Sequence, residues 1–127
     1  MNKKILRECI SFAWRKLKWH PEPFKHFSFV VSINKIVAIG YNRSTKKPLH
    51  SVTRNGYPKH SKIHAEFDAM SHLWLEGFEV VNVRLNNKGE FRNAAPCRCC
   101  LKLLKMFSCS MVYFTTSKGT IESWRIQ

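Results

Sequence analysis

The sequence has no hydrophobic run long enough to cross a bilayer, because its longest apolar stretches are as short as Phe27 to Ile33. No small-residue cleavage site follows the basic N-terminus, so we expect that segment to form a helix of the mature protein. Internal repeats, linkers and low-complexity tracts are also missing. We therefore predict a protein without membrane spans, and its 127 residues, 44% of them hydrophobic, fit a single domain covering 1–127.

The cysteines are odd in number, so they cannot all pair in disulfides within the chain. Four of the five crowd into the stretch 97–109, a spacing more typical of a metal cluster than of a disulfide framework. A thiolate metal site suits a reducing compartment, so we expect a cytoplasmic protein. The cysteines are Cys9, Cys97, Cys99, Cys100 and Cys109.

Acidic residues are scarce. The chain has 8 Asp and Glu against 22 Lys and Arg, a formal net charge of +14. Residues 1–62 hold 14 of the basic residues and two of the acidic ones, a net +12, which leaves +2 for residues 63–127. A positive field of this size favours polyanions such as nucleic acid, although a solubilising surface would carry the same charge.

Apolar periodicity predicts an α/β arrangement of helices and strands. Ile5, Cys9 and Ala13 recur at helical spacing, while aromatic and β-branched runs mark strands. Residues 42–60 show no hydrophobic period and are expected to form a long loop. The predicted helices are 3–19, 62–76 and 97–107, and the predicted strands are 27–33, 36–41, 78–85, 111–116 and 121–126.

The connection between the last two predicted strands is only three residues long, Ser117 to Gly119. A parallel pair needs a crossover of about a dozen residues or more. The last two strands are therefore expected to run antiparallel in a mixed sheet.

His64, Cys97 and Cys100 form a candidate zinc site. Catalytic zinc takes three protein ligands and keeps one position for water. Cys97 and Cys100 are three residues apart and share a helix face, whereas Cys99 lies about 200° around the helix from Cys97. Glu66, two residues after His64, can lean over the metal and transfer protons without being a ligand.

His64-Ala65-Glu66 followed by Pro96-Cys97-Arg98-Cys99-Cys100 matches the H-x-E and P-C-x-x-C signature of zinc nucleobase deaminases. The chain resembles the cytidine deaminase superfamily over most of its length. This resemblance implies a three-layer α/β fold, a five-stranded mixed sheet with helices on both faces, and one Zn²⁺ per chain.

The resemblance also implies roles for substrate-binding residues. Gly40-Tyr41-Asn42 is similar to the family's Gly-x-Asn, whose Asn contacts the ribose. Ala95 stands where a backbone carbonyl receives the exocyclic amine, and Ala65 is taken with it as a substrate-binding position. The antiparallel ending resembles the free-cytidine and bacterial toxin deaminases more than the tRNA adenosine deaminases, which favours cytosine over adenine.

The predicted loop 42–60 interleaves basic and aromatic residues, a pattern that suits single-stranded nucleic acid. A basic stripe on the first helix, from Lys4 to Lys18, would help to hold such a strand. Arg98, beside the metal motif, either meets a substrate phosphate or is simply exposed. The expected nucleic-acid contacts are Arg43, Lys46, Lys47, Arg54, Tyr57 and Arg98.

Three functions follow from these patterns. The first is hydrolytic deamination of cytosine to uracil in single-stranded DNA or RNA. The second is deamination of free cytidine, deoxycytidine or their monophosphates. The third is a non-catalytic, zinc-stabilised nucleic-acid-binding module whose metal is held by Cys97, Cys99, Cys100 and Cys109 without His64. The oligomeric state stays open.

Overall fold

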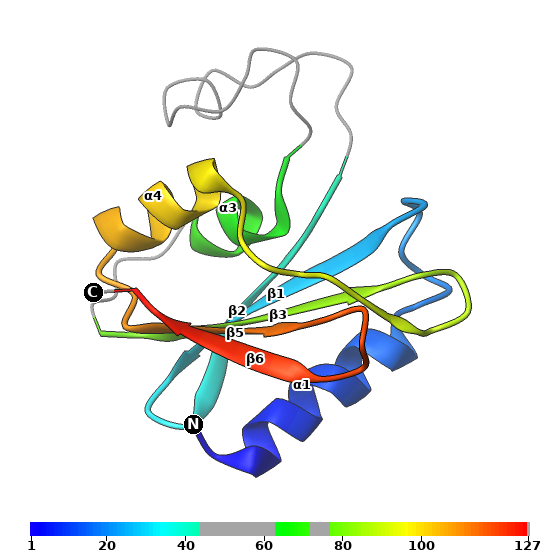
Figure 1. Ribbon diagram of the computed structural model, residues 1–127, viewed down its shortest axis with the longest axis horizontal. Helices are drawn as coiled ribbons and strands as arrows, with labels where there is room; N and C mark the ends of the chain where they lie inside the picture. Colours follow the sequence, from blue (N-terminus) through cyan, green and yellow to red (C-terminus); the bar gives the residue numbers. More distant parts are fainter. Residues whose placement is uncertain (44–62, 72–76, 127) are drawn as a thin grey trace.

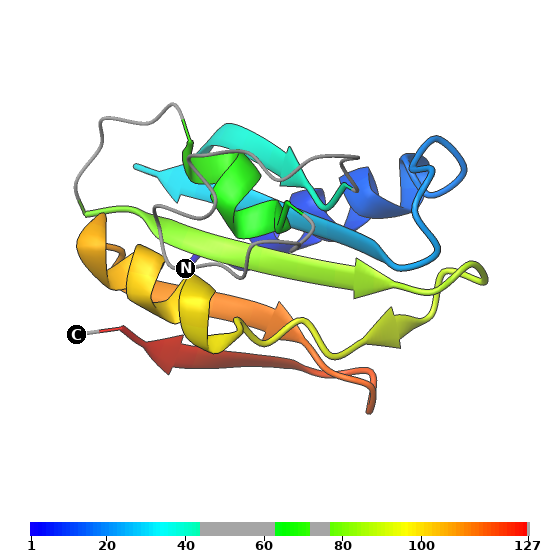
Figure 2. The ribbon, with the colours of Figure 1, turned by 90° about the horizontal axis from the view of Figure 1, so that it is seen from above.

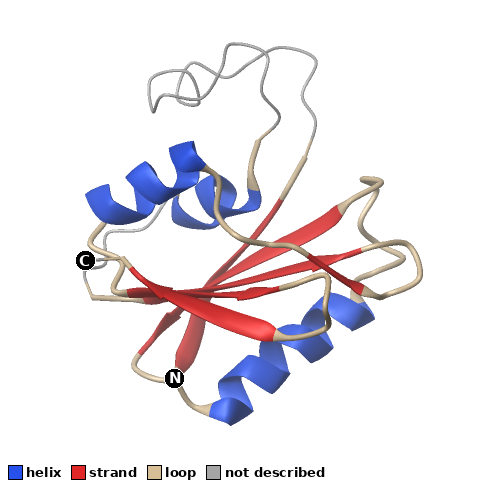
Figure 3. Ribbon diagram, viewed as in Figure 1, coloured by secondary structure: helices blue, strands red, loops and turns tan. Residues whose placement is uncertain are grey.

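A twisted mixed β-sheet forms the centre of the protein, with helices on both of its faces (Figures 1 and 3). The computed structural model describes residues 1–43, 63–71 and 77–126. The predicted fold class is confirmed. Among the described residues, no helix has both the length and the apolar character needed to cross a membrane.

Five strands follow in the order β2-β1-β3-β5-β6, and a short strand β4 pairs with the end of β3. The five predicted strands are all present. β4 is an addition, because two residues are too few to produce a periodic signal. The strands are β1 (Lys25–Ser32), β2 (Lys35–Tyr41), β3 (Glu79–Leu85), β4 (Phe91–Arg92), β5 (Met111–Thr115) and β6 (Ile121–Arg125).

β5 and β6 pair antiparallel, from Met111↔Arg125 to Thr115↔Ile121, as the three-residue connection predicts. β3 and β5 pair parallel, whereas β1 is antiparallel to both β2 and β3. β2 and β3 therefore run in the same direction on either side of β1.

α1 (Lys3–Arg15) packs against one face of the sheet through Ile5, Cys9 and Ala13. The predicted end at residue 19 is wrong. After Arg15 the hydrogen bonds tighten, with the Leu17 N–H donating to the Trp14 carbonyl, so the helix closes in turns before Pro21.

α3 (Ala65–Met70) and α4 (Arg98–Met106) lie side by side on the opposite face (Figure 2). The predicted start of α3 at residue 62 is wrong. The backbone of Ile63 pairs with Arg43 in an isolated β-bridge, which keeps it extended, and the predicted continuation over 72–76 lies outside the described residues. α4 starts one residue later than predicted because Cys97 is its N-cap.

Each of these two helices belongs to a crossover between parallel strands, from β2 to β3 and from β3 to β5. Both crossovers proceed in the same direction along the sheet, and such connections share one hand, so both helices fall on one face. α3 follows the carboxyl end of β2, and α4 follows the carboxyl end of β3 after the short antiparallel strand β4. The residues that start α3 and α4 are therefore brought to the same edge of the sheet.

Candidate active site

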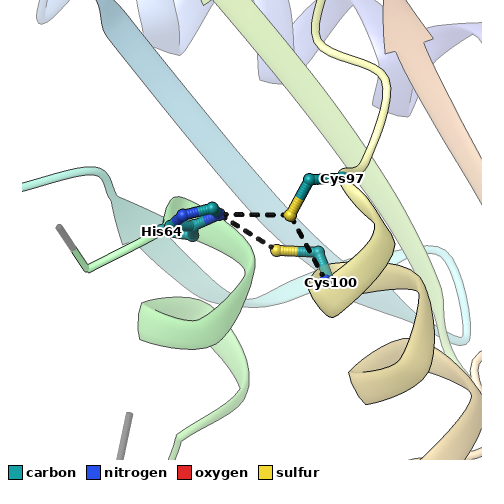
Figure 4. A group of neighbouring side chains, drawn as sticks. All are labelled: His64, Cys97 and Cys100. Carbon is teal, nitrogen blue, oxygen red and sulfur yellow. Dashed lines mark hydrogen bonds between the residues drawn. The ribbon is translucent and has the colours of Figure 1, made fainter. Parts of the chain in front are cut away.

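His64, Cys97 and Cys100 meet where α3 and α4 begin (Figure 4). His64 Nδ1 lies 3.5 Å from Cys97 Sγ and 3.4 Å from Cys100 Sγ. The three candidate ligand atoms all lie within 4.8 Å of one another. Among the described residues this is the one group of three or more His, Cys, Asp or Glu side chains so placed.

The spacing of these atoms fits a tetrahedral zinc ion. Zinc bonds of about 2.3 Å to sulfur and about 2.0 Å to nitrogen place neighbouring S and N ligands about 3.5 Å apart at tetrahedral angles. The observed distances of 3.4 and 3.5 Å between His64 Nδ1 and the two sulfurs match this value. Three protein ligands leave the fourth position for water, which is typical of catalytic rather than structural zinc.

The surroundings of Cys97 favour its thiolate. Its sulfur accepts a hydrogen bond from the Cys100 backbone N–H at 3.5 Å. Side-chain hydrogen bonding with Cys100, and then with His64, lowers the pKa of Cys97 to about 3. The same contact with Cys97 raises the pKa of His64. Because zinc binds thiolate rather than thiol, the start of α4 holds this ligand ready for a cation.

The other cysteines near the motif stand apart from the cluster. Cys109 is fully buried, its thiol donates to the Met111 carbonyl at 3.3 Å, and burial raises its pKa to about 12. Cys99 packs against the hydrophobic core. The four-cysteine site of the binding-module hypothesis is therefore not assembled, because two of its members point elsewhere.

Replacing single cysteines distinguishes the two possible pairings. We expect Cys99→Ser to keep about one zinc per chain and Cys100→Ser to lose it, since the metal then has two protein ligands instead of the usual three. Zinc content after dialysis, measured by atomic absorption, gives the result. Retention by Cys100→Ser together with loss by Cys99→Ser would show that the ligand pair is Cys97 and Cys99.

Glu66 lies in the first turn of α3 with 1% of its surface exposed. Its Oε2 accepts a hydrogen bond from Asn82 Nδ2 at 3.1 Å, and the same amide group donates to the Ala94 carbonyl at 3.3 Å. Its Oε1 is buried without a hydrogen-bond partner, 3.9 Å from His26 Nε2. One carboxylate oxygen is thus anchored, and the other is left for a ligand.

A pocket of about 250 Å³ opens over these groups. Asn42, His64, Glu66, Ala95 and Cys97 line it. Ala65 and Cys100 are fully buried behind it. Both polar ends of the Asn42 side chain bond to the backbone: Oδ1 accepts from the His26 N–H at 2.9 Å, and Nδ2 donates to the Phe24 carbonyl at 2.8 Å.

Two of the six expected nucleic-acid contacts fall within the described residues. Arg43 forms an ion pair with Asp68 at 3.1 Å. Arg98 is exposed at the start of α4 and does not line the pocket. Lys46, Lys47, Arg54 and Tyr57 lie outside the described residues.

Sequence reasoning missed four polar residues of the pocket region: His26, Asn82, Arg84 and Asn93. Asn82 did leave a signal, because it interrupts the apolar strand Val80-Val81-Asn82-Val83, and a buried amide needs a partner. His26 is half-buried, and desolvation lowers its pKa although nearby Glu66 acts in the opposite direction. Its place beside Glu66 arises from strand pairing that no local pattern reveals.

Comparisons with protein-family models and with curated proteins find no match. Solved structures of cytidine and dCMP deaminases do match, with 12 to 20% sequence identity, and these likenesses establish that the chain has the cytidine deaminase fold.

Three of the similar structures illustrate the match. The dCMP deaminase from the cyanophage S-TIM5, in complex with dCMP and dUMP, is 20% identical with a TM-score of 0.60, over 90% of this chain and 82% of that one. The cytidine deaminase from Burkholderia pseudomallei is 16% identical with a TM-score of 0.64, over 94% and 91%. That from Mycobacterium leprae is 15% identical with a TM-score of 0.59, over 93% and 92%.

Proposed function

We propose that the protein is a zinc-dependent hydrolytic deaminase that converts cytosine to uracil and releases ammonia. The observation that carries the proposal is the placement of Glu66 beside the His64, Cys97 and Cys100 cluster, with its free oxygen buried at one pocket. A binding module has no need of a buried carboxylate whose Oε1 lacks a partner, because such a group costs folding free energy. A catalytic site does need it.

His64, Cys97 and Cys100 would hold the zinc. When bound, zinc supplies Lewis-acid activation of water at neutral pH. The donor set is the one used by zinc deaminases, and the distances between its atoms fit the ion. A thiolate site of this kind also fits a reducing compartment, so we place the protein in the cytoplasm.

Glu66 would move the protons. In the overall reaction the oxygen of water ends on C4 of the ring and the C4–N bond breaks. One proton of the water goes to N3, which uracil keeps, and the other goes to the leaving amine, which departs as ammonia. A single carboxylate can carry both protons in turn if it is held still, and the Asn82 hydrogen bond of 3.1 Å holds it.

Asn42, Ala65 and Ala95 would position the substrate. Asn42 and Ala95 line the same pocket as His64 and Cys97, and Ala65 is fully buried between His64 and Glu66 in the sequence. Because the Asn42 amide is fixed by two backbone contacts, it presents a fixed edge to a sugar without losing side-chain entropy on binding.

The substrate we favour is single-stranded nucleic acid. Arg43 and Ile63 pair through two backbone hydrogen bonds of 3.0 and 2.9 Å, and Ile63 lines the pocket. The strongly basic segment 44–62 therefore leaves and rejoins the described structure at the rim of the site. The basic stripe of α1 does not contribute, because α1 covers the other face of the sheet (Figure 1).

A free pyrimidine nucleoside or nucleotide is the second candidate. It is favoured by the modest size of the pocket, about 250 Å³, and by the antiparallel β5 and β6. One nucleotide needs few cations, however, and the net charge of +14 exceeds that need.

A substrate panel tests the proposal. Zinc-loaded protein is incubated with single-stranded DNA, single-stranded RNA, nucleosides and mononucleotides, and a mass increase of about one unit per cytosine is sought. We expect conversion of cytosine in the strands. Ready conversion of cytidine or dCMP with both polymers untouched would overturn the polymer substrate but keep the deaminase. No conversion by zinc-loaded protein would overturn the deaminase.

A further inference from the structure

Arg84 places a positive charge in the wall of the pocket. It lies in β3, two residues after Asn82, and its backbone N–H donates to Thr115 Oγ1 at 3.1 Å. Its side chain is half-buried and lines the pocket together with His64 and Glu66. The guanidinium is therefore attached to the rigid centre of the sheet and not to a loop.

An aromatic ring holds the guanidinium in place. Arg84 Cζ lies 4.7 Å from the centroid of the Phe24 ring, within the range of a cation–π contact. Phe24 also lines the pocket, although 56% of its surface is exposed. A stacked guanidinium keeps its N–H groups in the plane of the fork, free to donate sideways.

The charge of Arg84 is not balanced within the described residues. Within the described residues the Asp68 carboxylate pairs with Arg43, and the Glu66 carboxylate lies 3.9 Å from His26; neither of them pairs with Arg84. Arg84 Nε is buried without a hydrogen-bond partner, and Nη1 makes only a long contact of 3.4 Å to the Asn93 carbonyl. An unpaired buried donor on a cation is costly, and an anion would satisfy it.

We propose that Arg84 binds a phosphate group of the substrate, so that the site selects phosphorylated cytosine nucleotides over the free nucleoside. The inference rests on the proposed deaminase function. A pyrimidine nucleoside has no anionic group, and phosphate is the anion that this class of substrate carries on its sugar. The planar fork of Arg matches phosphate oxygens through two parallel hydrogen bonds. The same contact serves a mononucleotide or a nucleotide within a strand.

Kinetics on matched substrates test the proposal. The value of kcat/KM is measured for deoxycytidine, dCMP and a short single-stranded oligodeoxynucleotide with one cytosine. We expect wild-type protein to prefer the phosphorylated substrates, and Arg84→Gln to lower their kcat/KM by about 10- to 100-fold, the value of one or two charge-assisted hydrogen bonds. The kcat/KM for deoxycytidine should change by less than about threefold, because this substrate carries no phosphate. Arg84→Lys should restore part of the loss.

Arg92→Gln is the matched control. Arg92 is exposed and lies opposite Arg84 in the β3–β4 pair. Its substitution therefore removes one positive charge, as Arg84→Gln does, from a neighbouring position. The kcat/KM of Arg92→Gln for every substrate should stay within about twofold of the wild-type value, as expected for the loss of a solvated cation. An equal loss on nucleoside and nucleotide in Arg84→Gln, or no preference in wild-type protein, would overturn the role of Arg84. Comparison of dCMP with the oligodeoxynucleotide shows whether the bound phosphate belongs to a mononucleotide or to a strand.

Binding separates this inference from the proposed activity. Calorimetric titration with dUMP and with deoxyuridine needs no turnover. We expect dUMP to bind about 10- to 100-fold more weakly to Arg84→Gln than to wild type, with Arg92→Gln unchanged. If no substrate is deaminated but this difference appears, the phosphate site stands and the catalytic proposal falls. If deamination occurs and dUMP binds both proteins equally, the phosphate site falls alone.

Discussion

Glu66→Gln is expected to abolish ammonia release while the protein keeps its zinc. The exchange removes one oxygen that can carry a proton and preserves the shape of the side chain, so that Asn82 Nδ2 can still donate to the remaining oxygen. General acid–base catalysis contributes about 100- to 10,000-fold, and here one group serves both proton transfers. We expect kcat to fall by about 1,000-fold or more, measured by coupled ammonia detection on the best substrate of the panel.

Glu122→Gln is the control for this change. Glu122 is exposed on the edge strand β6, so this substitution removes the same charge without touching the site. Its activity should equal that of wild type. Zinc content shows whether a loss of activity in Glu66→Gln comes from the missing carboxylate or from loss of the metal. A variant that keeps about one zinc per chain and still deaminates at more than a tenth of the wild-type rate would remove Glu66 from the mechanism.

Gly40→Ala is expected to destabilise the protein more than alanine at any other glycine within the described residues. A Cβ at Gly40 would lie 2.3 Å from the Ala65 carbonyl oxygen and 2.3 Å from the Ala69 nitrogen. Both atoms belong to the backbone of α3, which cannot give way as a side chain could. Moving the helix would disturb the core, and we expect the free energy of unfolding to fall by about 3 kcal/mol. Zinc affinity should fall with it, since His64 immediately precedes α3.

Gly119→Ala provides the contrast. Gly119 has φ of +82°, and a Cβ there would meet no atom within 4 Å. Its substitution costs only the left-handed backbone strain, about 1 kcal/mol. Urea unfolding of both variants, with zinc content measured alongside, gives the comparison. If Gly40→Ala were no more destabilising than Gly119→Ala, the close approach of β2 and α3 would be wrong.

Local patterns were enough to find most of the elements. The strands at 36–41, 78–85 and 111–116 appear within one residue of their predicted bounds, because alternation and aromatic content reflect burial on a sheet directly. The largest errors in bounds fall at helix ends. Ile63 has the right spacing for α3, yet its backbone pairs with Arg43, a long-range contact that helical periodicity cannot register.

The pocket wall was harder to predict than the metal motif. His64, Glu66, Cys97 and Cys100 come from two short segments, so their spacing is visible in the sequence. Asn82 and Arg84 lie two residues apart in one strand and share a face of the sheet with the motif only because β3 runs beneath both helices. Nothing in the residues around Arg84 distinguishes it from any other surface cation.

What the sequence determined by itself is the chemistry of the donor set and the direction of the last strands. Ligand types and helical spacing are local properties, and a three-residue connection leaves only an antiparallel pairing. The tertiary structure alone decided which groups anchor Glu66, that α1 and its basic stripe lie on the far face, and that Arg84 lines the pocket with its Nε unpartnered. These depend on which strands become neighbours, and that is settled by the crossovers rather than by any residue in isolation.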